Sequence, residues 1–590
     1  TNAELNHLIG LIQLELGNSD NSINYFKKAI EAQPNKMSFN FNLALSLKKS
    51  NKFEESIFYF KKVLDLDVNQ PYANFNLAHL YEVIGDTDLS VAHYQKSLQK
   101  DKSLFESYIN LALIFESIDQ IENAKKIYEE GIFNNPNNFS LRNNFGKLLN
   151  SEKNYKEAIT HLEKAYKINS NSSILNFNLA MSYKGLGEFE KAINHYKKTL
   201  ELNPNYYQAY SHLSSIYHNK NLYFEAVDFI KKGIQLNPEY AEAYNNYGVL
   251  LRDLNLMQQS EKALIKAVNI KPNYHTANWN LALTRLSQEN YKEGWLGFNS
   301  RWLNPNLEQN QCIFTNKKIW NGIDNGRLLV WSEQGIGDQI MFSRFFRNLK
   351  TFKGKIFAIL NPKLQSIFKA SFPYINFVNK LDQESFDFHL PIASLGQVFI
   401  NSKEDLIKNS KFFLKCKKSN IHKKIKTLQK KNFLIGISWK SVNDSIGENK
   451  SMKLSDLKDI LDLPNITFVN LQYGHVNDEI SSVNKVIKNK IINIEDIDIF
   501  NDITQMSALI QKLNLVVTIS NSTAHLAGAL GKDTILMLSK GKGHLWYWTK
   551  GENQKSSWYS SIKIIQQNKI NIWDNVLMET KELIESKINN

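Results

Sequence analysis

The chain has 590 residues, of which 42% are hydrophobic and 22% are charged, and its formal net charge at pH 7 is +14. This length allows three or four domains, and the hydrophobic fraction is enough to bury several cores. Its two cysteines, Cys312 and Cys416, exclude a disulfide-stapled scaffold and indicate a reducing, cytoplasmic compartment. No apolar run reaches the roughly 20 residues that cross a bilayer, and the first residues do not form a signal peptide.

The positive charge has two interpretations. It favours acidic partners, such as nucleotide phosphates or anionic lipid heads. Alternatively, a surface rich in lysine and asparagine reflects the base composition of the genome. Binding to nucleic acid would rest on net charge alone, so we expect no nucleic-acid partner.

Residues 1–305 repeat with a step of 34. The triplet Asn42-Leu43-Ala44 returns as Asn76-Leu77-Ala78 and then as Asn110-Leu111-Ala112. Later copies begin with Asn144, Asn178, His212, Asn246 and Asn280, and prolines recur at Pro34, Pro136, Pro204, Pro238 and Pro272. About nine copies with two helical patterns each resemble the tetratricopeptide repeat. The resemblance implies a superhelix with a concave inner face.

Helix formation does not explain the asparagine at the head of each copy, because asparagine is a mediocre helix former. Its recurrence therefore indicates another role. A carboxamide offers a donor and an acceptor together, which matches one peptide unit of an extended chain. The row resembles the asparagine ladder of the protein O-GlcNAc transferases and implies a protein or peptide acceptor. The alternative is that each side chain bridges neighbouring repeats. The predicted acceptor groove comprises Asn42, Asn76, Asn110, Asn144, Asn178, Asn246 and Asn280.

After residue 305 the pattern changes to alternating strands and helices, which predicts parallel sheets in an α/β fold. We expect two Rossmann-like lobes, residues 306–425 and 426–590, with ligands bound outside the carboxyl ends of the strands. The predicted strands are 327–332, 355–360, 433–440, 466–472, 513–520 and 533–538, and the predicted helices are 339–349, 454–461 and 522–531.

The first of three polar loops is Gln334-Gly335-Ile336-Gly337-Asp338. Its glycines allow a tight turn and a close backbone approach to a ligand. Asp338 stands at the carboxyl end of a strand, where a base could meet an acceptor hydroxyl. The alternative role for this aspartate is a helix N-cap.

The second polar loop spans 438–457 and contains Lys440, Lys450 and Lys453. A cation at this place could neutralise the charge of a departing diphosphate. The alternative for each lysine is a solvated side chain.

The third polar loop spans 518–538. Ser520, Asn521, Ser522 and Thr523 stand at the start of its helix, where backbone N–H groups and the helix dipole favour an anion. We therefore predict a phosphate site here. His525 lies one turn further on and either reaches the ligand or packs in the core.

Together and in this order, the three loops look like those of the heptosyltransferase-like glycosyltransferases, the superfamily that includes the ADP-heptose:lipopolysaccharide heptosyltransferases. The resemblance covers roughly residues 310–575. It implies a GT-B fold, inverting chemistry and no required metal or other cofactor. It also implies that Asp338 is the base, that Lys450 faces the donor phosphates, that Asn521 and Ser522 bind diphosphate, and that His525 is the family's histidine.

One feature of this chain departs from the pattern of these glycosyltransferases, and a second feature is additional to it. The family's helix start usually opens with an aspartate that contacts the donor sugar, and this chain has Ser520 there. The stretch Lys540–Trp548 places aromatic residues beside glycines, where they either stack on a ligand ring or hold the lobe together.

The stretch 408–431 is rich in lysine, with Ile421, Ile425 and Leu428 at helical spacing. It is either a basic amphipathic helix that touches an anionic membrane or a solvated linker between the lobes.

The sequence thus predicts a repeat superhelix fused to a glycosyltransferase that uses a nucleotide-diphosphate sugar. The rival prediction is a non-catalytic scaffold whose degenerate lobes only sense a nucleotide.

Overall fold

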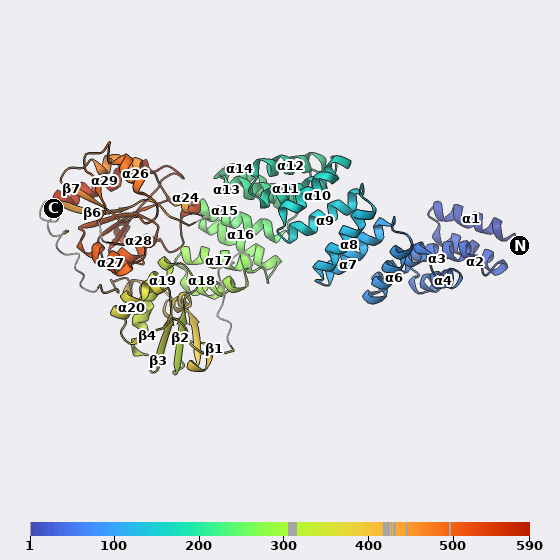
Figure 1. Ribbon diagram of the computed structural model, residues 1–590, viewed down its shortest axis with the longest axis horizontal. Coiled ribbons are helices and arrows are strands. Elements are labelled where there is room, and N and C mark those ends of the chain that lie inside the picture. The colour runs from blue at the N-terminus through green and yellow to red at the C-terminus, as the bar shows by residue number, and fades with distance from the viewer. Residues whose placement is uncertain are drawn as a thin grey trace. The chain divides into compact units, whose positions relative to one another are not determined.

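The computed structural model describes residues 2–304, 316–416, 425, 428, 432–443, 446–494 and 497–589 (Figure 1). It divides into two compact units, Thr1–Lys220 and Asn221–Asn590, and each is considered by itself. The predicted domain boundaries at 305/306 and 425/426 lie in or beside stretches outside the described residues, as does Cys312. None of the helices in the described ranges is long and apolar enough to cross a membrane.

The first unit is all-helical, and each repeat supplies a first and a second helix that pack against each other (Figure 1). Its helices are α1 (Ala3–Glu15), α2 (Ser19–Ala32), α3 (Met37–Lys49), α4 (Phe53–Leu66), α5 (Pro71–Ile84), α6 (Thr87–Lys100), α7 (Phe105–Ser117), α8 (Ile121–Asn134), α9 (Phe139–Ser151), α10 (Tyr155–Ile168), α11 (Ser173–Gly185), α12 (Phe189–Leu202) and α13 (Tyr207–Asn219).

The turn between the two helices of a repeat contains a residue with positive φ in every copy. In the first unit these residues are Gly17, Asn51, Gly85, Asp119, Lys153 and Gly187, and in the second unit they are Asn221, Asn255 and Glu289. Glycine adopts this left-handed conformation without strain, whereas lysine and glutamate rarely do. The packing of the helix pair therefore imposes the turn, whatever residue stands there.

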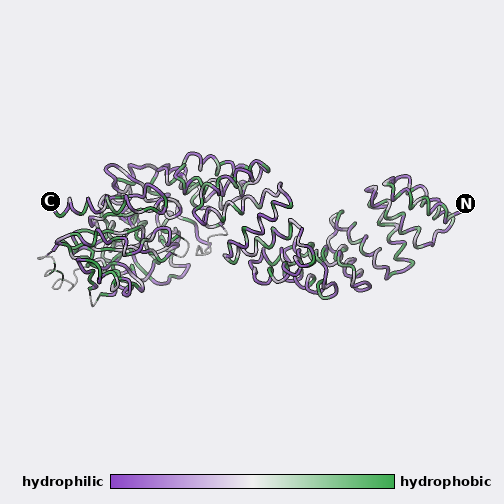
Figure 2. The backbone as a smooth tube through the Cα atoms, turned by 90° about the horizontal axis from the view of Figure 1, so that it is seen from above, coloured by the Kyte–Doolittle hydropathy of each residue, from purple (hydrophilic) through white to green (hydrophobic). Residues whose placement is uncertain are grey.

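Two positions of the second helix recur in the packing of each repeat. One is a large apolar residue that is buried, and the other is a residue, often small, where the second helix packs against a first helix. The apolar position is fully buried in Phe26, Phe60, Tyr94, Tyr128, Leu162 and Tyr196. At the crossing, a Cβ added to Gly131 would lie 2.9 Å from Tyr108, so only glycine fits. Figure 2 shows the resulting alternation of hydrophobic and hydrophilic stretches along the repeat helices.

The second unit begins with the last repeats and continues into the α/β part. The repeat helices are α14 (Tyr223–Leu236), α15 (Ala241–Asp253), α16 (Met257–Ile270), α17 (His275–Ser287) and α18 (Tyr291–Phe298), followed by the 3-10 helix η1 (Asn299–Leu303). Trp295 and Phe298 of α18 belong to the same hydrophobic core as Phe342 and Trp558 of the α/β part. The repeats therefore end inside the core of this unit.

Sheet A has the strand order β1-β5-β2-β3-β4, and all its pairings are parallel. Its strands are β1 (Lys318–Ile319), β2 (Arg327–Trp331), β3 (Lys355–Ile359), β4 (Ile375–Phe377) and β5 (Phe388–Pro391). The helices around it are α19 (Ile336–Phe342), η2 (Ser343–Thr351), η3 (Pro362–Leu364), α20 (Gln365–Ser371), η4 (Gln383–Ser385), η5 (Ile392–Ser394), α21 (Leu395–Phe399) and α22 (Lys403–Lys408).

Sheet B has the order β11-β10-β9-β6-β7-β8 and is also parallel throughout. Its strands are β6 (Phe433–Ser438), β7 (Ile466–Asn470), β8 (Ile491–Ile492), β9 (Leu515–Ile519), β10 (Thr534–Leu538) and β11 (Ile562–Gln566). Its helices are α24 (Gly447–Lys450), η6 (Leu454–Leu457), α25 (Lys458–Leu461), α26 (Asn477–Val483), α27 (Ile503–Lys512), α28 (Ser522–Ala529), η7 (Gly541–Gly543), η8 (Glu552–Gln554) and α29 (Asp574–Asn589).

The predicted parallel sheets are confirmed, and each of the six predicted strands is present with ends shifted by at most two residues. The predicted helix 339–349 is instead the short α19 followed by the 3-10 helix η2. The predicted helix 454–461 is divided in the same way into η6 and α25. The strands that the sequence did not indicate are β1, β4, β5, β8 and β11. All five lie at or next to a sheet edge, and β1, β4, β5 and β8 have four residues or fewer, so their sequences show little periodicity.

Candidate functional site

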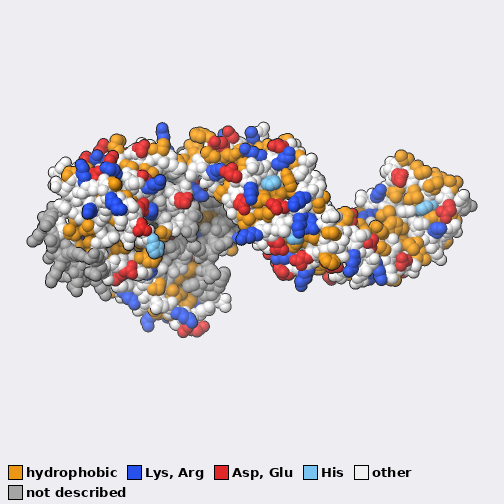
Figure 3. Space-filling view, turned by 45° about the horizontal axis from the view of Figure 1, so that its top comes forward, with side chains coloured by type: hydrophobic (Ala, Val, Ile, Leu, Met, Phe, Trp, Pro, Cys, Tyr) orange, Lys and Arg blue, Asp and Glu red, His pale blue; other side chains and the backbone are white. Residues whose placement is uncertain are grey.

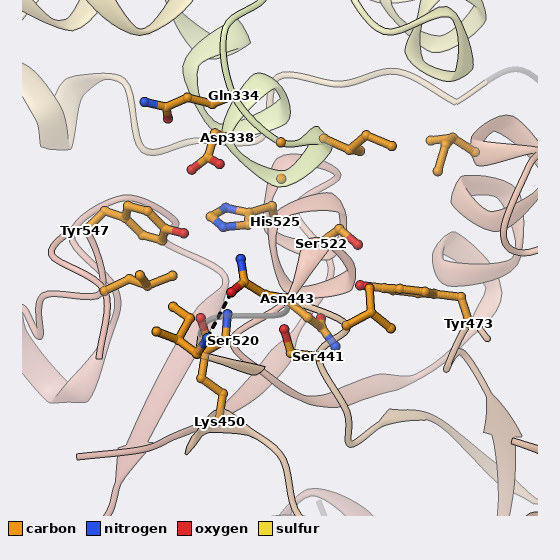
Figure 4. A pocket seen from close by; sticks show the side chains of 18 of the residues that line it. Gln334, Asp338, Ser441, Asn443, Lys450, Tyr473, Ser520, Ser522, His525 and Tyr547 are labelled. Carbon is orange, nitrogen blue, oxygen red and sulfur yellow. Dashed lines mark hydrogen bonds between the residues drawn. The ribbon is translucent and has the colours of Figure 1, made fainter. Parts of the chain in front are cut away.

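A cavity of about 550 Å³ lies in the second unit, and all three polar loops line it (Figure 4). Both sheets contribute to it, and so does the last complete repeat. The lining residues include Gln334, Gly335, Gly337, Asp338, Ser441, Asn443, Lys450, Tyr473, Phe500, Ser520, Asn521, Ser522, His525, Trp546, Tyr547, Trp279 and Leu283.

Strand order explains why the three loops converge. In sheet A, the chain passes from β2 to β3 on one side, while β5 lies on the other side of β2. In sheet B, β6 is followed by β7 on one side and has β9 on the other. Loops that leave such a switch point diverge and open a crevice at the carboxyl ends of the strands. The first loop leaves the switch point of sheet A, and the second and third leave that of sheet B.

Asp338 lies in the first turn of α19 and faces the cavity from the side of sheet A (Figure 4). Its carboxylate is close to Gly335, because a Cβ added there would be 3.5 Å from Oδ2. Burial raises the pKa of Asp338 to about 6, with the charge of Lys450 opposing this shift and that of Glu333 adding to it. The N-cap of α19 is Gly335, so the alternative role predicted for Asp338 is not the one observed.

Lys450 ends α24 on the opposite side of the cavity and is 5% exposed. A Cβ added to Gly543 would lie 2.9 Å from its Cγ, so the lysine stem packs directly against the backbone of η7. Burial lowers the pKa of Lys450 to about 8, and the charge of Asp338 opposes this. A buried carboxylate and a buried ammonium therefore influence each other across one cavity.

The third loop starts α28, and its asparagine acts as the N-cap. Asn521 Oδ1 accepts from the amide of Ala524 at 3.3 Å, and its Nδ2 donates to Ser438 Oγ at 2.7 Å. These bonds hold the start of α28 against the end of β6. Ser522 lines the cavity, whereas Thr523 is fully buried and not among the cavity residues. Ser520 lines the cavity and accepts from Trp548 Nε1 at 2.8 Å.

His525 both packs in the core and borders the cavity. Its ring stacks on Trp548 at 4.9 Å, and its Nδ1 is 3.0 Å from the hydroxyl of Tyr559. Burial lowers the pKa of His525 to about 3, helped by the charges of Lys450 and Arg344, so the imidazole is neutral. A Cβ added to Gly337 would be 3.0 Å from His525 Cδ2, which makes this glycine the close contact between α19 and α28.

Two predicted lysines are not brought to the cavity. Lys440 forms an ion pair with Glu479 at 2.6 Å, and Glu479 also accepts from Trp439 Nε1 at 3.2 Å. Lys453 is exposed, and its backbone amide donates to Asp456. Among the lysines of the second loop, only Lys450 faces the cavity.

The sequence did not indicate the contribution of the repeats. Trp279 and Leu283 of α17 line the cavity, one helical turn apart. It also missed Glu333, whose carboxylate is fully buried and bonded to Arg301 at 2.6 and 3.0 Å. Arg301 lies in η1, directly after the repeats, so this pair ties their end to the first loop.

The aromatic stretch 540–548 divides between the cavity wall and the core, and its stacking on a ligand ring stays a prediction. Trp546 and Tyr547 line the cavity, and Trp548 holds Ser520. The cavity also has an aromatic end at Tyr473 and Phe500, whose ring centroids are 6.0 Å apart. In Figure 4, Tyr473 lies on the other side of the view from Asp338, with Ser522 between them.

The repeated asparagines bridge neighbouring repeats at several places. Asn178 Nδ2 donates to Asn143 Oδ1 at 3.0 Å, and Asn280 Nδ2 donates to Asn245 Oδ1 at 2.9 Å. The other repeated asparagines form these hydrogen bonds: Asn42 with His7, Asn76 with Lys48, Asn110 with Tyr94, Asn144 with Asn143, and Asn246 with Asn245. The bonds of Asn144 and Asn246 lie within one helix, whereas the others join neighbouring repeats and fit the bridging alternative. The acceptor-groove role of the ladder stays a prediction.

The lysine-rich stretch is described only in part, and Ile421 lies outside the described residues. Ile425 is 1% exposed within the core of the second unit, and Leu428 packs against that core. At these two positions the apolar stripe faces protein. Within the described ranges, no group of three or more His, Cys, Asp or Glu side chains is placed to hold a metal ion.

Comparison with known proteins defines the class of the helical part. Family models of the tetratricopeptide repeat match residues 3–36, 38–69, 105–138, 139–172, 175–206, 207–240 and 241–274. Residues 3–274 are therefore a tetratricopeptide repeat array, as the 34-residue step predicted. Such arrays are protein-interaction scaffolds with extended binding surfaces.

Among curated proteins, the chain is similar to Protein FlbA of Caulobacter vibrioides, with 25% identity over 308 residues. The match covers 48% of this chain and 50% of FlbA, so the chain spans half the length of the curated relative that it matches.

Similar solved structures are also repeat proteins. YrrB, described as a TPR protein with an unusual peptide-binding site, is 21% identical over 31% of this chain and 95% of its own, with a TM-score of 0.28. MamA from Desulfovibrio magneticus RS-1 is 18% identical over 29% and 96%, with a TM-score of 0.27. A repeat protein from Cytophaga hutchinsonii is 20% identical over 41% and 99%, with a TM-score of 0.33.

Proposed function

We propose that the cavity of the second unit transfers a sugar from a nucleotide-diphosphate donor to an acceptor hydroxyl. The observation that carries this proposal is the pair formed by Asp338 and Lys450, which face one cavity at the switch points of two parallel sheets. A structural ion pair would bring the two groups into contact. Here the carboxylate and the ammonium stand on opposite sides of a space large enough for a ligand (Figure 4).

In the proposed reaction, Asp338 is the general base. It takes the proton of the acceptor hydroxyl, and the acceptor oxygen bonds to the anomeric carbon of the sugar. The bond from that carbon to the diphosphate oxygen breaks, and the nucleoside diphosphate leaves with the bonding electrons. A base with a pKa of about 6 is mostly ionised at neutral pH yet basic enough to accept a proton.

Lys450 and the start of α28 would stabilise the leaving diphosphate. With a pKa of about 8, Lys450 remains mostly protonated at pH 7. Its charge is partly desolvated, which strengthens its interaction with a phosphate. The backbone N–H groups at the start of α28, next to Ser522, add donors of the kind that bind phosphate. Neutral His525 would border the same region without adding charge.

The position of the repeats supports an acceptor delivered by them, because Trp279 and Leu283 of α17 form part of the cavity wall. An acceptor at this wall would touch a repeat helix and Asp338 together. The acceptor is then a peptide segment held by the array, which is a protein-interaction scaffold.

A second candidate function is a scaffold in which the cavity binds a nucleotide without transfer. Ser520 favours it, because its hydroxyl is bound to Trp548 where the glycosyltransferases that the loops resemble have an aspartate. Asp338 and Lys450 favour transfer.

The experiment is a thermal-shift panel of nucleoside diphosphates and nucleotide sugars on the full chain, followed by a donor-hydrolysis assay with the best ligand. We expect a raised melting temperature with one nucleotide, since a ligand that binds only the native state stabilises it. Donor turnover should be lost in Asp338→Ala, while nucleotide binding is retained. Equal turnover in wild type and Asp338→Ala would refute the base assignment, and binding without any turnover would favour the scaffold.

A further inference from the structure

A second cavity, of about 500 Å³, lies beside sheet A in the second unit, and we call it the η1 cavity. Its wall is formed by Asn299 and Trp302 of η1, by the loop that follows β1, by the end of β5, by η5 and by α21. Pockets that bind small molecules measure roughly 300–1,000 Å³, so the η1 cavity has room for such a ligand. Its described lining residues are all different from those of the candidate functional site, so the two cavities have separate walls.

The two cavities differ in charge. The candidate functional site is lined by the charged side chains of Asp338, Lys363 and Lys450, whereas no described residue that lines the η1 cavity has a charged side chain. Among the coloured side chains in Figure 3, acidic and basic groups are mixed over the surface, and no large field of one sign is visible. A charged ligand would find no compensating group in the η1 cavity, and burying an unpaired charge is costly. The lining therefore fits an uncharged ligand.

The lining also offers hydrogen-bonding groups that the fold does not use. Gln397 Oε1 accepts from Asn299 Nδ2 at 3.2 Å, and no described residue accepts a hydrogen bond from Gln397 Nε2. Asn321 Oδ1 accepts from the amides of Ile323 at 2.9 Å and Asp324 at 3.0 Å, while its Nδ2 has no acceptor among the described residues. Each carboxamide can donate and accept at the same time. These side chains suit a ligand that has many groups of both kinds.

The polar part of the wall is held in place by the surrounding fold. The buried Arg301 donates to Asn299 Oδ1 at 3.2 Å and to Ser394 Oγ at 2.7 Å. Gly322 has a φ of 87°, and a Cβ added to it would lie 2.7 Å from Val398 Cγ1, so glycine lets the loop after β1 approach α21 closely. Because these groups are already ordered, a ligand pays little conformational entropy to bind them.

Trp302 gives the η1 cavity an aromatic side. Its partly exposed ring lies 4.2 Å from the guanidinium of Arg301, and its centroid is 5.3 Å from that of Trp331. These contacts fix the indole at the cavity wall. A sugar ring has an apolar face of C–H groups and hydroxyls that both donate and accept, so it matches an indole combined with carboxamides.

We infer that the η1 cavity binds a neutral sugar unit, with the sugar ring against Trp302 and its hydroxyls bonded to Gln397 and Asn321. The sugar is either free or carried on a glycan, because the same lining would recognise both. This inference does not depend on the activity proposed for the candidate functional site.

The test is saturation-transfer NMR of the full chain with a panel of neutral monosaccharides and disaccharides, followed by titration of the best ligand. We expect at least one neutral sugar to bind, and glucuronate and glucosamine, which are charged at neutral pH, to bind more weakly. Gln397→Met keeps nearly the same side-chain volume and removes the amide, so it should weaken the sugar about tenfold. Gln365→Met is the matched control, because Gln365 lies on α20, which packs against the same sheet, and lines neither cavity.

Two further variants locate the bound sugar. Trp302→Leu should also weaken binding, whereas Asp338→Asn should leave it unchanged, because Asp338 faces the other cavity. Circular dichroism melts show which variants fold, and the partly exposed Gln397 position decides the result if Trp302→Leu does not fold.

The source of the sugar follows from comparing the free sugar with the same sugar linked to a serine peptide. Binding of either form supports the inference, and tighter binding of the linked form identifies a glycan as the source. The inference is overturned if no neutral sugar binds, if binding is unchanged in Gln397→Met or lost in Asp338→Asn, or if the charged sugars bind equally well.

Discussion

Replacing Asp338 with asparagine should stabilise the second unit at neutral pH. The folded protein holds this carboxyl with a pKa near 6, compared with 3.8 for an ordinary aspartate. Each pKa unit corresponds to about 1.36 kcal/mol, so keeping Asp338 ionised costs up to about 3 kcal/mol of folding free energy. Asparagine has nearly the same shape and no charge, so Asp338→Asn should recover much of this free energy.

The pH dependence of this gain has a defined sign. Between pH 4 and pH 6 the folded state binds more protons at Asp338 than the unfolded state, so its contribution to stability falls as pH rises. The advantage of Asp338→Asn should therefore be full above pH 6 and vanish near pH 4. In the range where it is full, the variant should also lose the proposed base and hence donor turnover.

Urea unfolding followed by circular dichroism at pH 7.5 and pH 4.5 measures the effect. Asp387→Asn is the control, because Arg327 holds the pKa of Asp387 at about 2 and the same change there should destabilise at pH 7.5. A destabilised Asp338→Asn at pH 7.5, or a gain that is equal at both pH values, would show that the carboxylate is not held at an energetic cost.

Two further predictions concern the contacts that build the cavity. Gly337→Ala should lower stability by about 1–2 kcal/mol, because the new methyl group meets His525 and the aromatic rings around it leave no room. Gly335→Ala should have little effect, and equal melting temperatures for the two variants would contradict this packing. Arg301→Met should cost roughly 3–5 kcal/mol by leaving Glu333 buried and unpaired, whereas adding Glu333→Met should recover most of the loss. Additive losses in the double variant would show that the two residues are not coupled.

The sequence by itself determined the repeats and the sheets, because both depend on local periodicity. A 34-residue step and two helical patterns define the helix pairs from Ala3 onward without any knowledge of contacts. Apolar runs of five or six residues sufficed for central strands such as β2, β6 and β9. They did not suffice for short strands such as β1 and β8, which pairing in the sheet stabilises.

The sequence also located the three polar loops, because strand ends carry glycine and small polar residues. It could not choose among the lysines of the second loop. Lys440 and Lys450 are alike as residues, yet one pairs with Glu479 on its own lobe while the other is buried facing Asp338. That choice depends on which partners lie within a few ångströms, and sequence spacing does not report it.

Only the tertiary structure decided that the last repeat and the α/β part of the second unit share one core and one cavity. In the sequence, Trp279 looks like an ordinary residue of the last repeat, and Arg301 looks like an ordinary residue just after it. In the fold, Trp279 lines the cavity and Arg301 holds Glu333 beside the turn of Asp338. Contacts between residues far apart in the chain arise from packing, so local periodicity specifies the elements whereas their burial against one another specifies the site.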